Sequence, residues 1–339
     1  MRIDTGLLSA DLRHVAAAAR EAEAMGYDGL WTAEAGHDPY LACAVAATAT
    51  ERVTIGTNIA VAFPRSPLVH AQIAWDLQAA SRGRFVLGLG TQVKGHNERR
   101  YSTPWVAPGP RLREMILLLR HIWDVWQNGA HPGFEGTHYR FSLMTPFFSP
   151  GPIAWPHVPI WIAAVNPYMC RLVGELCDGI HVHPFHSVQY LRETLMPNVQ
   201  QGLAKAGRSR QDLTLATTAF VITGRTRDDL ERAKDPVRMQ IAFYASTRAY
   251  APVLEAHGWG ETCQRLGEKA ATGDWAGMGA LVTDEMLEVY AVQGTWDELP
   301  DLMRRKYTGL IDRLAFYALP GILPDDPDAL RAIVTATRA

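Results

Sequence analysis

Residues 84–98 read RFVLGLGTQVKGHNE, a short apolar run that ends in two glycines and then becomes abruptly polar. The apolar residues are typical of a strand buried on both faces, and Gly88 and Gly90 leave room for a flat group to approach the backbone. The polar part places donors, acceptors and titratable groups in one loop: Thr91, Gln92, Lys94, His96, Asn97 and Glu98. If the strand belongs to a barrel, this loop lies at the catalytic face.

Strand-like and helical patterns alternate along most of the chain. The strand-like runs are Ile3–Leu8, Gly29–Thr32, Val53–Val61, Phe85–Leu89, Ile160–Ala164, Gly179–His183, Leu213–Thr223 and Leu314–Ala318. The helical patterns are Asp11–Met25, Pro39–Ala49, Pro67–Ala80, Arg111–Gln127, Tyr168–Leu176 and Val188–Ala206. Their Asp, Ser and Pro starts and Gly stops are the usual helix boundaries. Eight such units predict a parallel sheet closed into a (β/α)8 TIM-like barrel.

Two segments exceed a minimal barrel, at about residues 91–159 and 226–292. The first contains the polar loop, a long helix and a predicted hairpin over Phe134–Phe141 with Glu135 and Gly136 at its turn. The second is largely helical. Both follow strands, so both are expected on the catalytic side of the barrel. No linker composition or internal repeat divides the chain, which we interpret as one domain over residues 1–339.

The composition is that of an ordinary globular protein, with 47% hydrophobic and 20% charged residues. Lys plus Arg is 33 and Asp plus Glu is 35, so the formal charge is -2. This balance favours neither nucleic acid nor an anionic membrane as a partner. The four cysteines form no CxxC pair, which is typical of a reducing cytosol, and the N-terminus has no signal-peptide pattern. We therefore expect a cytoplasmic protein.

Phe141–Cys170 contains no Asp, Glu, Lys or Arg. Six prolines in this run exclude a simple membrane-spanning helix. We interpret it as an apolar loop followed by the strand Ile160–Ala164. If neighbouring segments bury that loop, it forms a wall of a pocket, and its aromatic residues then close over a substrate.

Titratable side chains follow the second strand, where residues 31–39 read WTAEAGHDP. Glu34 and His37 are candidates for general acid and base work at a strand end. The structural alternative is that Glu34 pairs with an arginine. Asp38 is assigned to capping of the helix that begins at Pro39.

The third strand-like run continues as GTNIAVAFPRSP and carries Gly56, Asn58 and Arg65. Glycine and asparagine in an otherwise small, apolar strand indicate an irregular backbone, such as a bulge beside a tight turn.

Residues 178–186 read DGIHVHPFH and place His181 and His183 on one face of a strand by alternation. Two histidines at a barrel strand end can bind a metal, although no further ligands are evident. The favoured interpretation is hydrogen bonding to a phosphate or a ring edge, or packing in a pocket wall. In AAVNPYM, residues 163–169, a strand turns into a helix whose first amides suit a phosphate.

Together these segments resemble the luciferase-like monooxygenase superfamily, and within it the coenzyme F420-dependent oxidoreductases. The segments that carry the resemblance are EAEAMGYDGLWTAEAGHDP (21–39), the run from GTNIAVAF to GHNERR (56–100), PIWIAAV (159–165) and CDGIHVHPF (177–185). The similarity runs nearly end to end and in matching order.

The resemblance implies a TIM-like barrel whose deazaflavin ring lies across the strand C-termini. It implies a non-prolyl cis peptide, which would fall at Asn58-Ile59. The remaining positions that it assigns to cofactor contacts are Gly88, Gly90, Thr91, Asn97, Ala163, Ala164, Val165, Asn166, His181 and His183. Arg65, Gln92 and His96 fall in the expected substrate pocket.

One departure from the family pattern concerns the proton donor. Many relatives have an acid followed directly by histidine after the second strand, whereas here Ala35 follows Glu34. His37 or His96 could substitute, and neither can be assigned by position.

We therefore predict an F420-dependent oxidoreductase that transfers a hydride between the deazaflavin and a small, largely apolar organic substrate. Glu34 or His37 would move the proton. The alternatives are a monooxygenase that uses reduced FMN on the same barrel and, more remotely, a metal-dependent hydrolase built on His181 and His183. The family commonly forms homodimers, so we expect a homodimer without nucleic acid or membrane partners.

Overall fold

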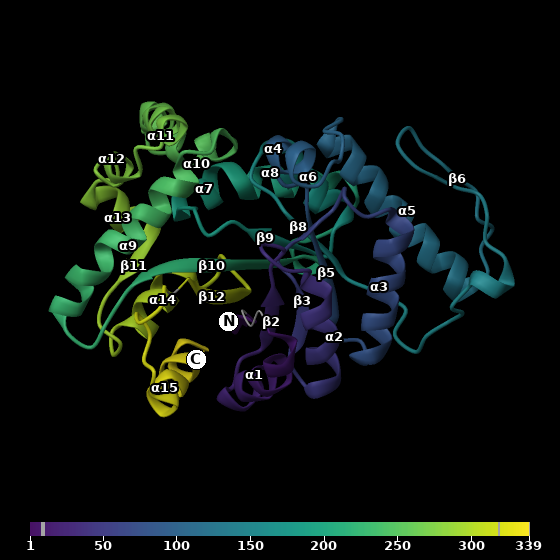
Figure 1. Ribbon diagram of the computed structural model, residues 1–339, viewed down its shortest axis with the longest axis horizontal. Coiled ribbons are helices and arrows are strands. Elements are labelled where there is room, and N and C mark those ends of the chain that lie inside the picture. Colours follow the sequence, from purple (N-terminus) through teal and green to yellow (C-terminus); the bar gives the residue numbers. More distant parts are fainter. Residues whose placement is uncertain (8–10, 318, 339) are drawn as a thin grey trace.

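The computed structural model describes residues 1–7, 11–317 and 319–338. Within these residues, eight parallel strands alternate with helices (Figure 1). The strands are β1 (Arg2–Gly6), β2 (Gly29–Thr32), β3 (Thr54–Thr57), β5 (Phe85–Gly90), β8 (Ile160–Ala163), β9 (Gly179–Val182), β10 (Thr214–Ile222) and β12 (Arg313–Tyr317). Pairing of β1 with β12 and of β9 with β10 closes the ring. The predicted (β/α)8 barrel is confirmed.

An outer layer of helices covers the strands. Its members are α1 (Leu12–Met25), α2 (Pro39–Ala49), α3 (Pro67–Ala80), α5 (Pro108–Asn128), α6 (Pro167–Leu176), α8 (Met196–Lys205), α14 (Leu299–Tyr307) and α15 (Pro327–Arg338). Asp11, Ser66 and Asn166 accept N-terminal amides of α1, α3 and α6. Gly26 and Gly129 end α1 and α5 in the left-handed conformation that glycine adopts easily. The helix predicted over 188–206 is divided into α7 (Val188–Tyr190), a π-helical turn η2 (Leu191–Leu195) and α8.

The strand predicted over Val53–Val61 is interrupted. β3 ends at Thr57, and the chain resumes as β4 (Ala60–Val61), which pairs with β5. The peptide bond between Asn58 and Ile59 lies in the interruption and is cis, as predicted.

The first insertion is smaller than predicted. The polar loop after β5 folds into a short helix, α4 (Lys94–Arg99), and the hairpin consists of β6 (Phe134–Glu135) and β7 (Arg140–Phe141). Glu135 therefore lies in a strand rather than at the turn. The long helix α5 contacts α3 and α6, so it belongs to the outer layer of the barrel.

The apolar loop exposes two of its aromatic side chains. It contains the short helix η1 (Pro146–Phe148), and Phe147 and Phe148 are 88% and 70% exposed. Their rings lie edge to face against each other with centroids 5.2 Å apart. These two side chains therefore lie largely in solvent, and the expectation of a lid over a substrate stays a prediction.

The second insertion forms a helical lobe at the upper left of Figure 1. It comprises α9 (Arg227–Ala245), η4 (Arg248–Tyr250), α10 (Ala251–Glu255), α11 (Gly260–Thr272), α12 (Trp275–Gly279) and α13 (Asp284–Tyr290). The chain then forms β11 (Ala291–Gln293), which extends the sheet beside β10. A short 3-10 helix, η3 (Arg210–Asp212), precedes β10. Among the described residues, none of the helices is both long and apolar enough to cross a membrane.

A buried ion pair joins the first and last barrel strands. Arg313 Nη2 and Nε lie 2.7 and 2.8 Å from the two carboxylate oxygens of Asp4, and both residues are 2% exposed. The indole of Trp31 donates to Asp4 at 2.8 Å. Burial raises the pKa of Asp4 even though Arg313 opposes this shift.

Candidate active site

Large side chains form a floor inside the barrel. Trp31 on β2, Val86 on β5, Trp161 on β8 and Ala216 on β10 pack together as one buried cluster. The strand register places Gly56 level with both Trp31 and Val86. A side chain at Gly56 would come within 2.5 Å of the Trp31 ring, so the absence of a side chain at Gly56 makes room for the indole.

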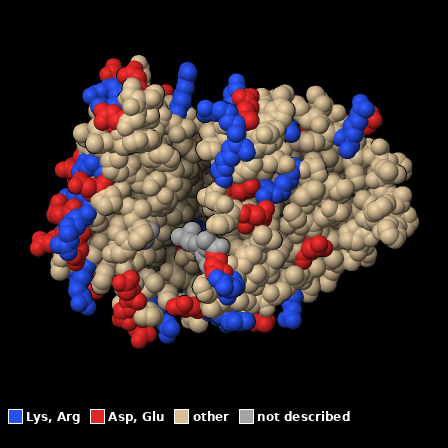
Figure 2. Space-filling model, in the orientation of Figure 1, with Lys and Arg blue, Asp and Glu red and all other residues tan. Residues whose placement is uncertain are grey.

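Small residues line the barrel above this floor. Two positions beyond Trp161 and Ala216, Ala163 on β8 and Thr218 on β10 share their inward-facing side, and Ala33 follows the end of β2 directly. Ala33 is exposed, and Ala163 and Thr218 are half-buried. Inward-facing residues that reach solvent indicate that the mouth of the barrel is open. A hollow is visible near the centre of the molecule in Figure 2, beside the helical lobe.

The two glycines of β5 do not widen this opening. A Cβ on Gly88 would lie 1.7 Å from the Thr57 carbonyl oxygen and 2.8 Å from His181 Nε2. A Cβ on Gly90 would lie 2.8 Å from the Ile59 side chain. Both glycines therefore accommodate neighbouring protein atoms, which corrects the prediction that their space admits a flat cofactor.

His181 lies at the level of the floor. Its ring packs against Trp31 and Trp161 at centroid distances of 4.9 and 5.1 Å. Burial lowers its pKa to about 3, so the imidazole is neutral at physiological pH. A hydrogen-bonding interaction with the Thr57 backbone opposes part of this shift. Among the described residues, the Nε2 atom makes no other hydrogen bond, so it can also bind a ligand or a water molecule.

An aromatic wall, which we define as His183, Tyr244, Tyr250 and Tyr317, stands at one side of the mouth. The His183 ring stacks on Tyr250 at 4.2 Å and meets the Tyr244 ring edge-on at 4.6 Å. The hydroxyl groups of Tyr244 and Tyr317 are 2.9 Å apart. All four residues are half-buried. The wall joins the ends of β9 and β12 to the helical lobe.

The tautomer of His183 follows from its backbone contact. Burial lowers its pKa to about 3, so the ring is neutral. Its Nδ1 accepts a hydrogen bond from the Phe185 amide at 3.1 Å. A neutral imidazole that accepts at Nδ1 carries its proton on Nε2. His183 therefore offers a neutral N–H donor at the barrel mouth.

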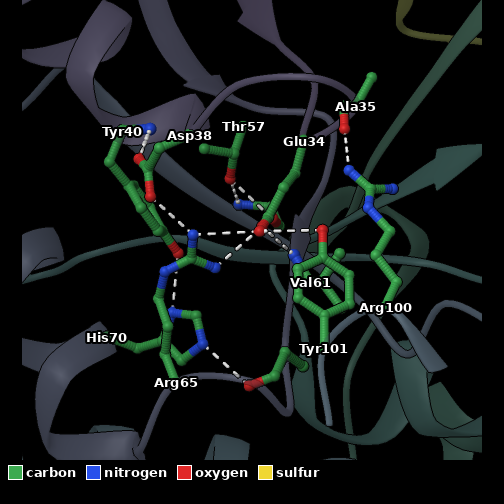
Figure 3. Close-up of polar contacts among 12 residues, drawn as sticks. Glu34, Ala35, Asp38, Tyr40, Thr57, Val61, Arg65, His70, Arg100 and Tyr101 are labelled. Carbon is green, nitrogen blue, oxygen red and sulfur yellow. Dashed lines mark hydrogen bonds and ion pairs between the residues drawn. The ribbon is translucent and has the colours of Figure 1, made fainter. Parts of the chain in front are cut away.

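Glu34 is held by its neighbours rather than left free for proton transfer (Figure 3). Arg65 donates two hydrogen bonds to its carboxylate, at 2.9 and 3.1 Å. The Val61 amide donates at 2.7 Å and the Tyr101 hydroxyl at 3.2 Å. The side chain of Glu34 is 6% exposed. The alternative of an arginine partner is thus confirmed, and the geometry does not support an acid–base role.

Arg65 also binds Asp38, at 2.6 Å, so two carboxylates engage its guanidinium. This arrangement gives no support to its predicted place in the substrate pocket. Asp38 accepts the Tyr40 amide at 2.8 Å, which confirms that it caps α2. Figure 3 shows His70 beside Arg65. His70 lies 2.7 Å from the Tyr40 hydroxyl and 2.9 Å from the Ala62 carbonyl. Arg65 thus links the segments after β2 and β4.

His37 and His96 do not join this cluster. Both are exposed, and in the described part of the chain neither side chain has a hydrogen-bond or ion-pair partner. No contact in the structure supports a role for His37 in proton transfer, which stays a prediction. Gln92 adopts a positive φ of 57°, and its side chain accepts the Val93 amide at 3.1 Å.

Asn97 braces the start of α4. Its amide nitrogen donates to the carbonyls of Thr91 and Val93 at 2.9 and 3.2 Å. Its Oδ1 atom is buried without a partner among the described residues. Arg100 donates to the Ala35 carbonyl, which ties α4 to the segment after β2.

Residues 163–166 form the turn from β8 into α6. The Asn166 side chain accepts the Met169 amide at 3.0 Å, so it serves as a helix cap. The Val165 carbonyl accepts the Tyr190 hydroxyl. Ala163 faces inward, whereas Ala164 is buried.

Three residues of the aromatic wall were not predicted. Alternation along β12 could have placed Tyr317 inward beside Ala315. No sequence signal places Tyr244 and Tyr250 over the barrel, because they belong to the lobe. In the described residues, no group of three or more His, Cys, Asp and Glu side chains could hold a metal ion. The geometry thus gives no support to the hydrolase alternative.

Comparisons with known proteins agree with this architecture. The family model described as luciferase-like monooxygenase matches residues 1–313. An uncharacterized protein of Mycobacterium tuberculosis is 44% identical over 309 residues, which cover 91% of each chain. A 5,10-methylenetetrahydromethanopterin reductase of Archaeoglobus fulgidus is 30% identical over 285 residues, covering 82% of this chain and 81% of that one.

One solved structure has nearly the same fold over its full length. It is the coenzyme F420-dependent tetrahydromethanopterin reductase of Methanopyrus kandleri, with a TM-score of 0.79 and 20% sequence identity. The alignment covers 100% of this chain and 99% of the reductase.

Proposed function

This chain belongs to the luciferase-like monooxygenase family, and from that membership we propose an oxidoreductase that uses coenzyme F420 to transfer a hydride to or from a small organic substrate. Two comparisons support the choice of cofactor. A relative from Mycobacterium tuberculosis at 29% identity carries coenzyme F420-dependent oxidoreductase in its name, and one solved structure of the same fold is a coenzyme F420-dependent reductase.

The observation that carries the proposal is the open barrel mouth. Ala163 and Thr218 face inward above the tryptophan floor and stay partly accessible, and Ala33 at the end of β2 is exposed. Small side chains over a rigid aromatic floor suit a flat, largely apolar ring. The Nε2 atom of His181 supplies a polar atom at the level of that floor. These features fit a deazaflavin, and Trp31, Trp161 and His181 are the residues that would hold it.

When bound, the deazaflavin supplies a carrier that takes up or releases two electrons as a hydride, together with one proton. The protein's part is to position the substrate and to exclude water. In this proposal, His183 Nε2–H and the paired hydroxyls of Tyr244 and Tyr317 are the donors that would hold a substrate oxygen. Burial raises the pKa of Tyr244, so its phenol stays protonated at neutral pH and can donate.

The test is a titration of the purified protein with oxidised F420 and, in parallel, with FMN. We expect saturable binding of F420. The A163L variant places a larger side chain in the mouth and should weaken that binding at least about tenfold, with unchanged circular dichroism. Binding of FMN alone would overturn the F420 assignment and favour a monooxygenase that uses reduced FMN. That enzyme is the second candidate, because the family is that of luciferase-like monooxygenases.

A further inference from the structure

A groove of about 630 Å³ lies outside the barrel mouth. Its walls come from α7, α13, β11 and α14, and we call it the outer groove. None of its lining residues belongs to the aromatic wall or to the floor of the barrel. Its volume is in the range of small-molecule sites.

Two basic residues of α14 line this groove without acidic partners. The Lys306 ammonium donates to the carbonyls of Val289 and Ala291 at 3.0 and 2.9 Å. An ammonium has three N–H donors, so these contacts leave one unused. In the described part of the chain, neither Lys306 nor Arg305 forms an ion pair, and Glu288 on the groove is bonded to neither.

The neighbouring Arg304 differs from these two residues. It pairs with Asp301 and donates to the Ala336 carbonyl, so its charge has a carboxylate partner within the protein. Burial lowers the pKa of Lys306 to about 8, which reflects the cost of holding its charge without a carboxylate nearby. The outer groove thus carries positive charge that the protein does not neutralise.

Much of the remaining lining is apolar. Val188, Val289, Val292 and Leu302 contribute hydrocarbon surface. The polar pair Ser187 and His257 is internally satisfied, because Ser187 Oγ and His257 Nε2 lie 2.7 Å apart. The two cations are therefore the groups of the outer groove that most need a ligand.

We propose that the outer groove binds an amphipathic anion, with a carboxylate or phosphate head against Arg305 and Lys306 and an apolar chain along the valine and leucine side chains. Arginine matches carboxylate and phosphate geometry through paired N–H donors, and lysine adds a point charge. The site is separate from the proposed F420 site and does not depend on it.

Calorimetric titration of the full chain with decanoate and with decyl phosphate tests this proposal. Decanol and inorganic phosphate serve as the chain-only and head-only controls. We expect one saturable site for at least one of the two anions, with binding at least about tenfold weaker for both controls. The tighter of the two anions identifies the head group.

Variants localise the binding. R305Q and K306M should each weaken the anion at least about tenfold, whereas R304Q on the same helix should leave it unchanged. If K306M fails to fold, R305Q alone decides, because Arg305 is exposed. The proposal fails if neither anion saturates a site, if decanol binds as tightly, or if the folded variants bind like the parent protein.

Discussion

Glu34 illustrates how the partners of a residue set its role. Its carboxylate accepts hydrogen bonds from a guanidinium, a main-chain amide and a phenol. A general base needs a lone pair within reach of the substrate proton. Because these partners already engage both oxygens, Glu34 is better described as a positioning residue that joins the segments after β2 and β4.

Removing Arg65 tests this assignment. R65M leaves the largely buried Glu34 carboxylate without its cation, and we expect a loss of about 3 kcal/mol in the free energy of unfolding. H37A is the matched control from the same segment, because His37 is exposed, and it should change stability by no more than about 0.5 kcal/mol. Urea denaturation measures both. Equal stability of the two variants would contradict the assignment.

At the scale of single residues, the sequence predicts where polar groups gather better than what they do. The position of Glu34 at a strand end was evident, but the choice between catalysis and an ion pair depended on Arg65, 31 residues away. Asp38 was predictable because capping is a local interaction. For His183, the sequence predicted a contact with the cofactor. It could not predict the stacking of His183 on Tyr250, because that contact depends on how a distant insertion folds.

Within β5, Gly88 is expected to determine whether the strand can pack against β3. A G88A substitution would place a methyl group 1.7 Å from the Thr57 carbonyl, so the backbone has to move. We expect destabilisation of about 3 kcal/mol or more, seen as a lower thermal unfolding midpoint. G36A is the control, because no atom lies within 4 Å of its new Cβ. A midpoint for G88A equal to that of G36A would show that the contact is easily relieved.

At the scale of elements, the regular helices and strands were predictable, and the irregular ones were only partly so. The Asp11 cap and the Gly26 stop located α1 closely, and Pro67 after the Ser66 cap located the start of α3, because these signals act within one turn. The break between β3 and β4 was indicated by Gly56 and Asn58, yet its form came only from the family resemblance. Helix α4 was missed, because it is short and held by the tertiary contacts of Asn97 and Arg100.

For the whole molecule, the Asp4–Arg313 pair should strengthen closure of the barrel. D4A leaves a buried guanidinium unpaired between β1 and β12, and we expect a cost of about 3–5 kcal/mol in urea denaturation. The double variant D4L/R313M removes both charges and should recover most of that loss. If the double variant is as unstable as D4A, packing volume rather than the unpaired charge explains the effect.

The barrel as a whole was predictable because alternation of strands and helices is repeated eight times and few topologies satisfy it. The same argument could not place the lobe over the mouth. Tyr244 lies on α9, and its contact with Tyr317 joins residues 73 positions apart in the chain. Such contacts depend on the three-dimensional course of an insertion, for which the sequence offers no periodic signal.

Buried histidines should make the stability of the whole molecule depend on pH. Burial lowers the pKa of His181 and His183 to about 3, and of His70 and His186 to about 4, from 6.5. Above pH 6.5 their contribution to stability is fully present. As the pH falls from 6.5 toward 4, only the unfolded chain takes up these protons, so stability is lost. Asp4 acts in the opposite direction, because burial raises its pKa and its contribution is lost as the pH rises.

We therefore expect the free energy of unfolding to fall between pH 7.5 and pH 5, with each histidine contributing up to about 1.4 kcal/mol per pH unit below 6.5. Urea denaturation at pH 7.5, 6 and 5 gives the slope. H70Q removes one of the four histidines that take up a proton on unfolding. The change in the free energy of unfolding per pH unit should therefore be smaller in H70Q by up to about 1.4 kcal/mol, even if the variant is less stable at every pH. An H70Q slope equal to that of the parent protein would mean that His70 takes up its proton in the folded state, which is incompatible with its burial against the Tyr40 hydroxyl and the Ala62 carbonyl.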